Sequence, residues 1–198
     1  MTNKQKIYSL LGSLLMVTLL QGCTGAVVGG AAAGGAAVIH DRRSAGTIID
    51  DQVIELKAFD RINGNAEILE NTHVNVKSHN YVVLITGEAP TEKLKNDVYE
   101  LIKTIPKVKR IHNELIIAAP SSYTSRTSDS WITAKVKTAM FKITDIEGFD
   151  STRVRVVTDN GSVFLMGLVK RNEADAVTEL VRKISGVQRV IKVFEYLD

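Results

Sequence analysis

The sequence predicts an α+β protein that contains two tandem copies of one small domain, each with the order helix–strand–strand–helix–strand. Three observations predict this fold class. The second half of the chain repeats the first at an offset of about 80 residues, the repeated blocks alternate apolar and polar residues, and the segments between them carry apolar residues at helical spacing. Each copy spans about 70 residues and buries only a modest core, so some packing of one copy on the other is expected.

The repeat is clearest in two pairs of blocks. VNVKSHNYVVLITGE (74–88) matches VRVVTDNGSVFLMGL (154–168), and IPKVKRIHNEL (105–115) matches ISGVQRVIKVF (184–194). All four blocks alternate in the manner of strands. The matched residues in the first pair of blocks are Val74 and Val154, Val76 and Val156, Asn80 and Asn160, and Gly87 and Gly167.

In the second copy, the first block contains a hairpin signal. The sequence DNGS, residues 159–162, interrupts the alternation. Asn-Gly is a pair that readily adopts the left-handed backbone angles of a two-residue type I′ turn. The sequence therefore predicts a β-hairpin over residues 154–168.

Helical stretches lie between the strand blocks and before each first strand. Residues 91–105 and 172–184 carry apolar side chains at intervals of three and four, which places them on one face of a helix. Further helices are expected around 50–60 and 129–143. The apolar positions of the two internal helices are Leu94, Val98, Leu101, Ile102 and Ile105 in the first copy, and Ala176, Val177, Leu180, Val181 and Ile184 in the second.

These elements define the domain boundaries. The first copy is expected to occupy residues 50–118 and the second residues 129–198. The segment between them, APSSYTSRTS at 119–128, is polar and contains turn-forming residues, so we interpret it as a linker.

Residues 1–22 have the features of an export signal peptide. Lys4 and Lys6 give a positive start, and residues 7–20 form a mostly apolar stretch of 14 residues, too short to span a bilayer comfortably. The stretch ends in LQGC, residues 20–23, which resembles the lipobox of bacterial lipoproteins.

Cys23 is therefore predicted to carry a lipid anchor, an S-diacylglyceryl group with an N-acyl chain such as palmitate; no other cofactor is expected. Two or three acyl chains, at about 0.8 kcal/mol per buried CH₂, hold a protein on a membrane almost permanently. By resemblance to the lipoprotein sorting rule, Thr24 favours the periplasm-facing side of the outer membrane over retention. The alternative is that residues 1–22 are a simple secretory signal and that Cys23 follows it by chance. Cys23 is the only cysteine, so the chain forms no internal disulfide.

Residues 23–49 are interpreted as the lipidated cysteine followed by a flexible tether. The run GAVVGGAAAGGAAVI, residues 25–39, offers little side-chain surface to bury and is too short to cross a bilayer. It also lacks the ending of a phosphate-binding loop. A Gly-rich coil of the length of residues 24–49 reaches roughly 25–30 Å, so the folded part is expected to reach the bilayer surface.

The charge of the chain argues against a nucleic-acid partner. The formal net charge is +3, and removal of residues 1–22 takes away two lysines and no acid, which leaves +1. Nucleic-acid-binding domains are usually strongly basic. We therefore expect no nucleic acid among the partners.

The residue pattern also gives no sign of catalysis. The four histidines, His40, His73, His79 and His112, are scattered and have no companion ligands at metal-binding spacing. No serine lies in a nucleophile elbow. We expect neither a metal site nor an enzymatic activity.

The only tryptophan lies in DSWITAKVKTAMFK, residues 129–142, where three lysines follow it and no acid after Asp129 interrupts them. We expect a helix here with Asp129 or Ser130 as the N-cap. Its core-facing stripe contains Ile132, Val136, Ala139, Met140 and Ile143. A second stripe, displaced by about 100°, contains Trp131, Lys135, Thr138 and Lys142, with Lys137 on a more outward flank.

Two interpretations of this second stripe are open. At a bilayer interface an indole lies between headgroups and acyl chains, and each lysine gains about 1 kcal/mol near anionic lipid. Alternatively, Trp131 fills a gap between the two domains and the lysines are merely solvated. The first copy differs, because its helix around 50–60 has no tryptophan and carries four acids, Asp50, Asp51, Glu55 and Asp60. Only the second helix is suited to an anionic surface.

The repeated pattern resembles the BON domain of bacterial periplasmic and outer-membrane proteins. The resemblance covers residues 50–198 and rests on the paired strands that end in Gly87 and Gly167, and on the segments VKRI (108–111) and VQRV (187–190). One departure is Lys107, which stands where the second copy has Gly186 and where the family commonly has glycine.

The resemblance implies a three-stranded mixed sheet packed on two helices in each copy. With the predicted lipid anchor at Cys23, the chain resembles the BON-domain outer-membrane lipoproteins, which are associated with cell division and envelope stress and bind lipid. It implies that the second domain binds anionic phospholipids, such as phosphatidylglycerol or cardiolipin, through its first helix, with enrichment at the division septum. The residues expected to make this contact are Trp131, Lys135, Lys137, Thr138 and Lys142.

An alternative function is that of a periplasmic adaptor that binds outer-membrane or envelope-assembly proteins. In that case Trp131 would be the energetic centre of a protein interface, a role in which tryptophan is enriched.

Overall fold

The computed structural model describes residues 41–120 and 123–198. The predicted signal peptide, the predicted lipidation site Cys23, His40 and the Gly/Ala-rich run lie outside the described residues. Residues 41–198 form one compact unit that contains both copies of the repeated domain.

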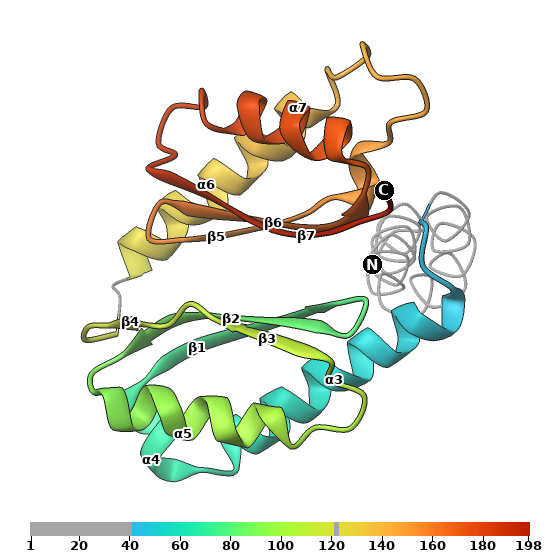
Figure 1. The fold of residues 1–198 in the computed structure, drawn as a ribbon. Helices are drawn as coiled ribbons and strands as arrows, with labels where there is room; N and C mark the ends of the chain where they lie inside the picture. Colours follow the sequence, from blue (N-terminus) through green and yellow to red (C-terminus); the bar gives the residue numbers. More distant parts are fainter. Residues whose placement is uncertain (1–40, 121–122) are drawn as a thin grey trace, which may run out of the picture. The chain divides into compact units, whose positions relative to one another are not determined.

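The first domain has its helices on one face of a mixed sheet (Figure 1). Its core forms where the apolar stripes of α3 and α5 meet the sheet, around Ile54, Val98 and Ile102. The elements in chain order are α3 (Ala45–Asn63), α4 (Ala66–Asn71), β1 (His73–His79), β2 (Val82–Ala89), α5 (Glu92–Lys103), β3 (Arg110–Asn113) and β4 (Ile116–Ile117).

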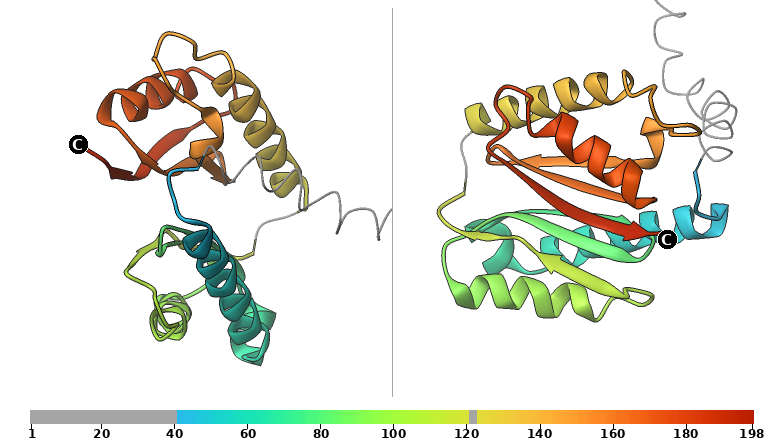
Figure 2. Two further views of the ribbon diagram at one scale, coloured as in Figure 1. Left: turned by 90° about the vertical axis from the view of Figure 1, so that its right-hand side faces the viewer. Right: turned by 45° about the horizontal axis from the view of Figure 1, so that its top comes forward.

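The second domain repeats this plan, with α6 and α7 on the same face of its sheet in every view (Figures 1 and 2). Its core lies around Val136, Leu165 and Val177. The elements in chain order are α6 (Tyr123–Met140), the 3₁₀ turn η2 (Ser151–Arg153), β5 (Arg155–Asp159), β6 (Ser162–Val169), α7 (Arg171–Val181) and β7 (Arg189–Tyr196).

Both sheets are mixed, as predicted. β1 pairs antiparallel with β2, and β3 pairs parallel with β2; β5, β6 and β7 repeat this order. The helix between the second and third strands makes the crossover that a parallel pair requires. The central strand of each domain is therefore the second one, β2 or β6.

The two central strands are covered on both faces. Val83 and Ile85 of β2 face the helices of their own domain. Between them, Val82 and Leu84 belong to a separate apolar cluster shared with the second domain. The other members of this interdomain cluster are Val157, Phe164, Met166 and Val193. The sheet face without helices in one domain is thus covered by the same face of the other.

Each first helix carries a buried aspartate that binds the hairpin turn. Oδ1 and Oδ2 of Asp129 accept hydrogen bonds from the backbone N–H groups of Gly161 and Asn160, both at 2.9 Å. Asp51 accepts from Tyr81 N–H at 2.9 Å and from Asn80 N–H at 2.7 Å. Each carboxylate thus provides hydrogen-bond acceptors for two backbone N–H groups of its hairpin turn.

The predicted turn geometry is confirmed. Asn160 and Gly161 have φ values of 47° and 68°, as a type I′ turn requires. The first copy makes the same turn with Asn80 and Tyr81, at 53° and 68°, although tyrosine rarely takes positive φ. The hydrogen bonds to Asp51 compensate for this conformation.

Gly87 and Gly167 lie at the end of each hairpin opposite the turn, where the backbone of the neighbouring strand leaves no room for a side chain. A Cβ on Gly87, whose φ is 118°, would lie 1.8 Å from the carbonyl oxygen of His73. A Cβ on Gly167 would lie 2.6 Å from the carbonyl oxygen of Arg153.

The predicted linker and N-cap are wrong in part. Helix α6 begins at Tyr123, so much of the segment 119–128 is helical. Asp129 lies inside the helix and caps nothing, because its carboxylate is needed at the hairpin turn. The first part of α6 was not recognised in the sequence because YTSRTSD, residues 123–129, lacks the apolar periodicity by which helices are identified.

The C-terminal end of the predicted tether is also structured. Arg43 donates to Asp41 at 2.7 Å and to Asp51 at 2.8 Å. Helix α3 begins at Ala45, with the Ser44 hydroxyl accepting from Thr47 N–H. The interpretation of residues 23–49 as a flexible tether therefore fails from Asp41 onward.

Three small elements were not predicted: α4, η2 and β4. β4 pairs with β2 and extends the first sheet to four strands. Lys107, which replaces the glycine of the second copy, takes φ of 72° and places its Nζ 2.7 Å from Asp50. The turn is therefore the same as that of Gly186, whose φ is 98°.

Arg42 joins the start of the described chain to the second domain. It donates two hydrogen bonds to the buried carboxylate of Glu173, at 2.6 and 2.7 Å, and one to the carbonyl of Leu168. Burial alone would raise the pKa of Glu173, but the hydrogen bonds from Arg42 and from Lys170 N–H outweigh it and lower the pKa.

Replacement of Asp129 with alanine should destabilise the protein by about 2–4 kcal/mol, because two buried turn amides lose their acceptor. Asp145→Ala, an exposed aspartate after α6, is the matched control and should change stability little. Urea unfolding of the mature chain, with Cys23→Ser to prevent acylation, measures both. Equal stability of the two variants would contradict the assigned role of Asp129.

Glu173→Gln should lower the free energy of unfolding by about 2 kcal/mol at pH 7. Since the pKa of Glu173 is lowered by folding, its stabilisation is complete above the unfolded value of about 4.3 and is lost as the pH falls through the folded pKa. The difference from the parent should therefore shrink below about pH 4. Urea midpoints across this range test it, and Glu179→Gln on the exposed side of α7 is the control. A difference that does not depend on pH would exclude the charge of Glu173 as its cause.

Candidate functional site

Helix α6 presents one face to its own domain. Ile132, Val136 and Met140 are almost fully buried. The hydroxyl of Thr133 donates to that of Thr158 on β5 at 2.7 Å, and Asp129 binds the turn after β5. These contacts fix the rotation of the helix about its axis.

The opposite face carries two aromatic side chains. Trp131 and Phe141 are each 69% exposed, the highest values among the large apolar side chains of residues 41–120 and 123–198. Phe141 directly follows the last residue of α6 and lies ten residues after Trp131, which by helical spacing is about 15 Å along the axis and about 80° around it. Two such rings on one exposed face cost solvation free energy unless another surface covers them.

Lysines flank this face on both sides. Lys135 donates to the carbonyl oxygen of Ser185, which holds its ammonium group near the α6 surface. Lys137 and Lys142 are exposed. Within the described part of the chain, none of the three forms an ion pair, so their charges are not compensated locally.

The structure groups four of the five predicted contact residues. Trp131, Lys135, Thr138 and Lys142 line a shallow groove of about 290 Å³ along α6. Lys137 lies on the other flank, beside Phe141, and lines a different cavity.

Phe141 is the exposed residue that the sequence reasoning missed. It follows Thr138 by three positions and Lys137 by four, so it belongs to the outward face by helical spacing. Helical spacing could therefore have identified Phe141 as exposed. It was overlooked because the nearby apolar residues Met140 and Ile143 belong to the core-facing stripe.

The structure excludes one interpretation of Trp131. The space between the two sheets is filled by strand residues such as Leu84, Phe164 and Met166. Trp131 is exposed and does not belong to this cluster.

The first helix of the first domain, α3, presents fewer unpaired negative charges than its sequence suggests. Asp51 is buried at the hairpin turn, and Asp50 is paired with Lys107. Glu55 is bonded to Arg155 of the second domain at 2.7 Å. The exposed residues of α3 include Leu56 and Phe59, and that helix has a single lysine, Lys57, against three near the exposed face of α6.

The described histidines are not arranged as a metal site. His73 Nδ1 lies 3.0 Å from the buried carboxylate of Glu88, whose other oxygen accepts a hydrogen bond from Asn160. Residues 41–120 and 123–198 contain no group of three or more His, Cys, Asp or Glu side chains placed to hold a metal ion. Across the same residues, no helix has the length and apolar character needed to cross a bilayer.

Substitution on the buried face of α6 should lower stability much more than substitution on its exposed face. Met140→Ala removes a buried side chain and should cost about 2–5 kcal/mol. Trp131→Ala removes an exposed ring and should change the unfolding free energy by less than about 0.5 kcal/mol. Urea unfolding of the mature Cys23→Ser chain compares them, and a large loss in the Trp131 variant would show that the ring supports the fold.

Comparisons with known proteins agree with this organisation. The family model described as the BON domain matches residues 50–119 and 128–198. The chain is 39% identical over 195 residues to the outer membrane lipoprotein DolP of Haemophilus influenzae, covering 98% of this chain and 97% of that protein. It is 34% identical over 158 residues to the 21 kDa hemolysin of Actinobacillus pleuropneumoniae, covering 80% of each.

Among solved structures, the C-terminal domain of CdsD, a structural protein of the type III secretion system of Chlamydia trachomatis, is 16% identical. The match covers 75% of this chain and 67% of that one, with a TM-score of 0.29. This likeness is too weak to support a conclusion about fold or function. The family match and the identity to its relatives confirm the resemblance inferred from the sequence: the chain belongs to the BON-domain family and contains two BON domains.

Proposed function

We propose that this protein is an outer-membrane lipoprotein that binds anionic phospholipids through the exposed face of α6. The observation that carries the proposal is the pair of exposed rings, Trp131 and Phe141, flanked by Lys135, Lys137 and Lys142 without paired acids. The role is non-enzymatic, and it supports the integrity of the outer membrane.

The chemistry of this face suits a bilayer interface. Aromatic rings settle between the headgroups and the acyl chains. Each lysine gains about 1 kcal/mol near an anionic surface, so three lysines and a ring give roughly 4–5 kcal/mol in total. That free energy corresponds to a dissociation constant near the millimolar range.

Such weak binding becomes useful next to a membrane anchor. The N-acyl and S-diacylglyceryl chains proposed for Cys23 keep the protein at the bilayer, where the effective concentration of lipid is high. The α6 contact then orients the second domain on a surface to which the protein is already held. Phosphatidylglycerol and cardiolipin are the proposed ligands, because both are anionic phospholipids.

The relatives support the location. The name of the Haemophilus influenzae protein places that protein in the outer membrane as a lipoprotein, and its alignment includes 97% of its length. We extend the proposal to enrichment at the division septum, which the family resemblance implies.

Trp131→Glu should abolish binding of the mature Cys23→Ser chain to vesicles that contain phosphatidylglycerol, since it places an acid where a ring enters the interface. Phe141→Glu should have the same effect. Phe59→Glu is the matched control, because Phe59 is similarly exposed, at 64%, on the first helix of the first domain. Vesicle flotation measures bound protein at low ionic strength.

Vesicles of phosphatidylcholine alone should bind little protein, and Lys142→Gln should weaken binding to the anionic vesicles by about fivefold. Equal binding to both kinds of vesicle, or binding unaffected by Trp131→Glu, would refute the proposal. Loss of co-purifying outer-membrane proteins in the Trp131 variant, but in none of the lysine variants, would instead favour the adaptor function.

A further inference from the structure

A second, basic cavity lies beside the α6 face. It has a volume of about 390 Å³, which is within the range of small-molecule sites. The C-terminal end of α6, the η2 turn and the start of β5 form part of its wall, and Arg43 and His79 complete it. We call this space the basic cavity; its polar lining includes Arg43, His79, Lys137, Ser151 and Arg155.

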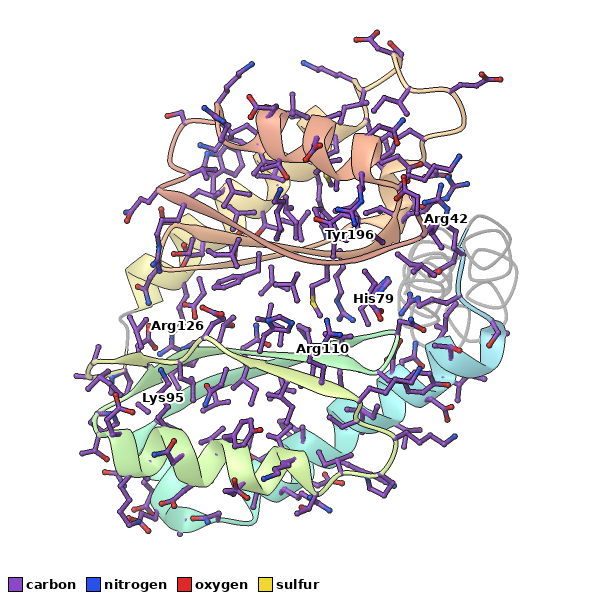
Figure 3. The ribbon with its side chains drawn as sticks, in the orientation of Figure 1. Arg42, His79, Lys95, Arg110, Arg126 and Tyr196 are labelled. Carbon is purple, nitrogen blue, oxygen red and sulfur yellow. The ribbon has the colours of Figure 1, made fainter. Side chains whose placement is uncertain are left out.

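His79 is the least expected group in its wall. Its side chain, which is labelled in Figure 3, is only 5% exposed and lines the cavity. It makes no hydrogen bond within the described residues. Burial, together with the nearby charge of Arg43 and a smaller effect of Arg155, lowers the pKa of His79 to about 4, against the opposing charges of Asp41 and Asp51. At neutral pH the ring is therefore uncharged and offers one N–H donor.

The two arginines in the wall retain free donors. Arg43 donates through three of its nitrogens to Asp41 and Asp51. Arg155 donates to Glu55 and to the carbonyl of Ser78. A guanidinium has five N–H groups, so about two remain unused on each arginine.

The acids behind these arginines hold them in place without filling the cavity. Asp41, Asp51 and Glu55 are all bonded to a guanidinium and do not line the cavity. Lys137 contributes a further positive charge with no paired acid, and the hydroxyl of Ser151 is also unpaired within residues 41–120 and 123–198. The cavity thus combines charged and neutral donors, and no carboxylate is among the residues that line it.

The repeat provides an internal comparison. The equivalent space in the first domain, about 580 Å³, lies between α3 and β1 and is lined by Leu56, Phe59 and Leu69. Phe59 occupies the helix position that corresponds to Lys137. The one lysine in that wall, Lys77, lies 3.6 Å from Glu55. The basic lining is therefore a feature of this cavity that its counterpart in the first domain lacks, and it does not follow from the fold.

We infer that the basic cavity binds a phosphoryl group, as a phosphate monoester or diester. Phosphoryl oxygens are acceptors that match guanidinium, ammonium, imidazole and hydroxyl donors. The inference does not rest on the proposed function, because free phosphate satisfies the same donors. A lipid headgroup is an equally suitable source, since Lys137 and Phe141 lie both at the cavity and beside the exposed face of α6.

The test follows the His79 ring by NMR in the mature Cys23→Ser chain, at pH 6 and constant ionic strength. Inorganic phosphate, glycerol 3-phosphate and short-chain phosphatidylglycerol below its micelle concentration are titrated separately. At least one ligand should give a saturable shift of the His79 signals and raise the pKa of the ring, because a bound anion offsets the charges of Arg43 and Arg155. A response to inorganic phosphate identifies a free-phosphate site, and a response to phosphatidylglycerol alone identifies a headgroup site.

Two lysine variants serve as a matched pair. Lys137→Gln should weaken the His79 response about fivefold, whereas Lys142→Gln, two residues after the end of α6 and outside the cavity, should leave it unchanged. Trp131→Glu should also keep the His79 response even though vesicle binding is lost, so failure of the proposed function and failure of this inference are distinguishable. The absence of a saturable shift with all three ligands, or an equal effect of both lysine variants, overturns the inference.

Discussion

The structure depends on a carboxylate buried between each first helix and the hairpin beside it. Asp51 and Asp129 satisfy the N–H groups of turns whose residues have positive φ, and buried amides without an acceptor are strongly unfavourable. A single side chain therefore fixes both the position of the helix and its rotation about its own axis. Because Asp129 points inward, Trp131, two positions and about 200° further on, points outward. The exposed face of α6 is a consequence of this contact.

The packing of one sheet on the other has a second consequence. A small sheet with helices on one side leaves its other side to be covered, and here each domain covers the other through residues such as Leu84 and Phe164. The outer faces of the helices take no part in this cluster. They have diverged without disturbing the core: α3 presents Leu56 and Phe59, whereas α6 presents rings and lysines.

The repeat, the strand order and the turn at Asn160 were predictable, because alternation and Asn-Gly turns are local signals. The outward direction of Trp131 followed from helical spacing. The beginning of α6 was not predictable, since residues 123–129 are mostly polar and lack the apolar periodicity by which a helix is recognised. The role of Asp51 was misread as surface charge, because nothing in the sequence near Asp51 reveals a turn about 30 residues away. The basic cavity was missed for the same reason: Arg43, His79 and Lys137 are brought together only by folding.

The two arginines at the start of the described chain bear on how this protein withstands mechanical load. Arg42 is hydrogen-bonded to Glu173 on α7 and to Leu168 near the end of β6, while Arg43 is hydrogen-bonded to Asp51 on α3. A force applied to the amino-terminal side of Arg42 is thus transmitted to both domains through these two adjacent residues. Such a force therefore loads the charged hydrogen bonds of Arg42 and Arg43 before it reaches the packing of α3 on its sheet.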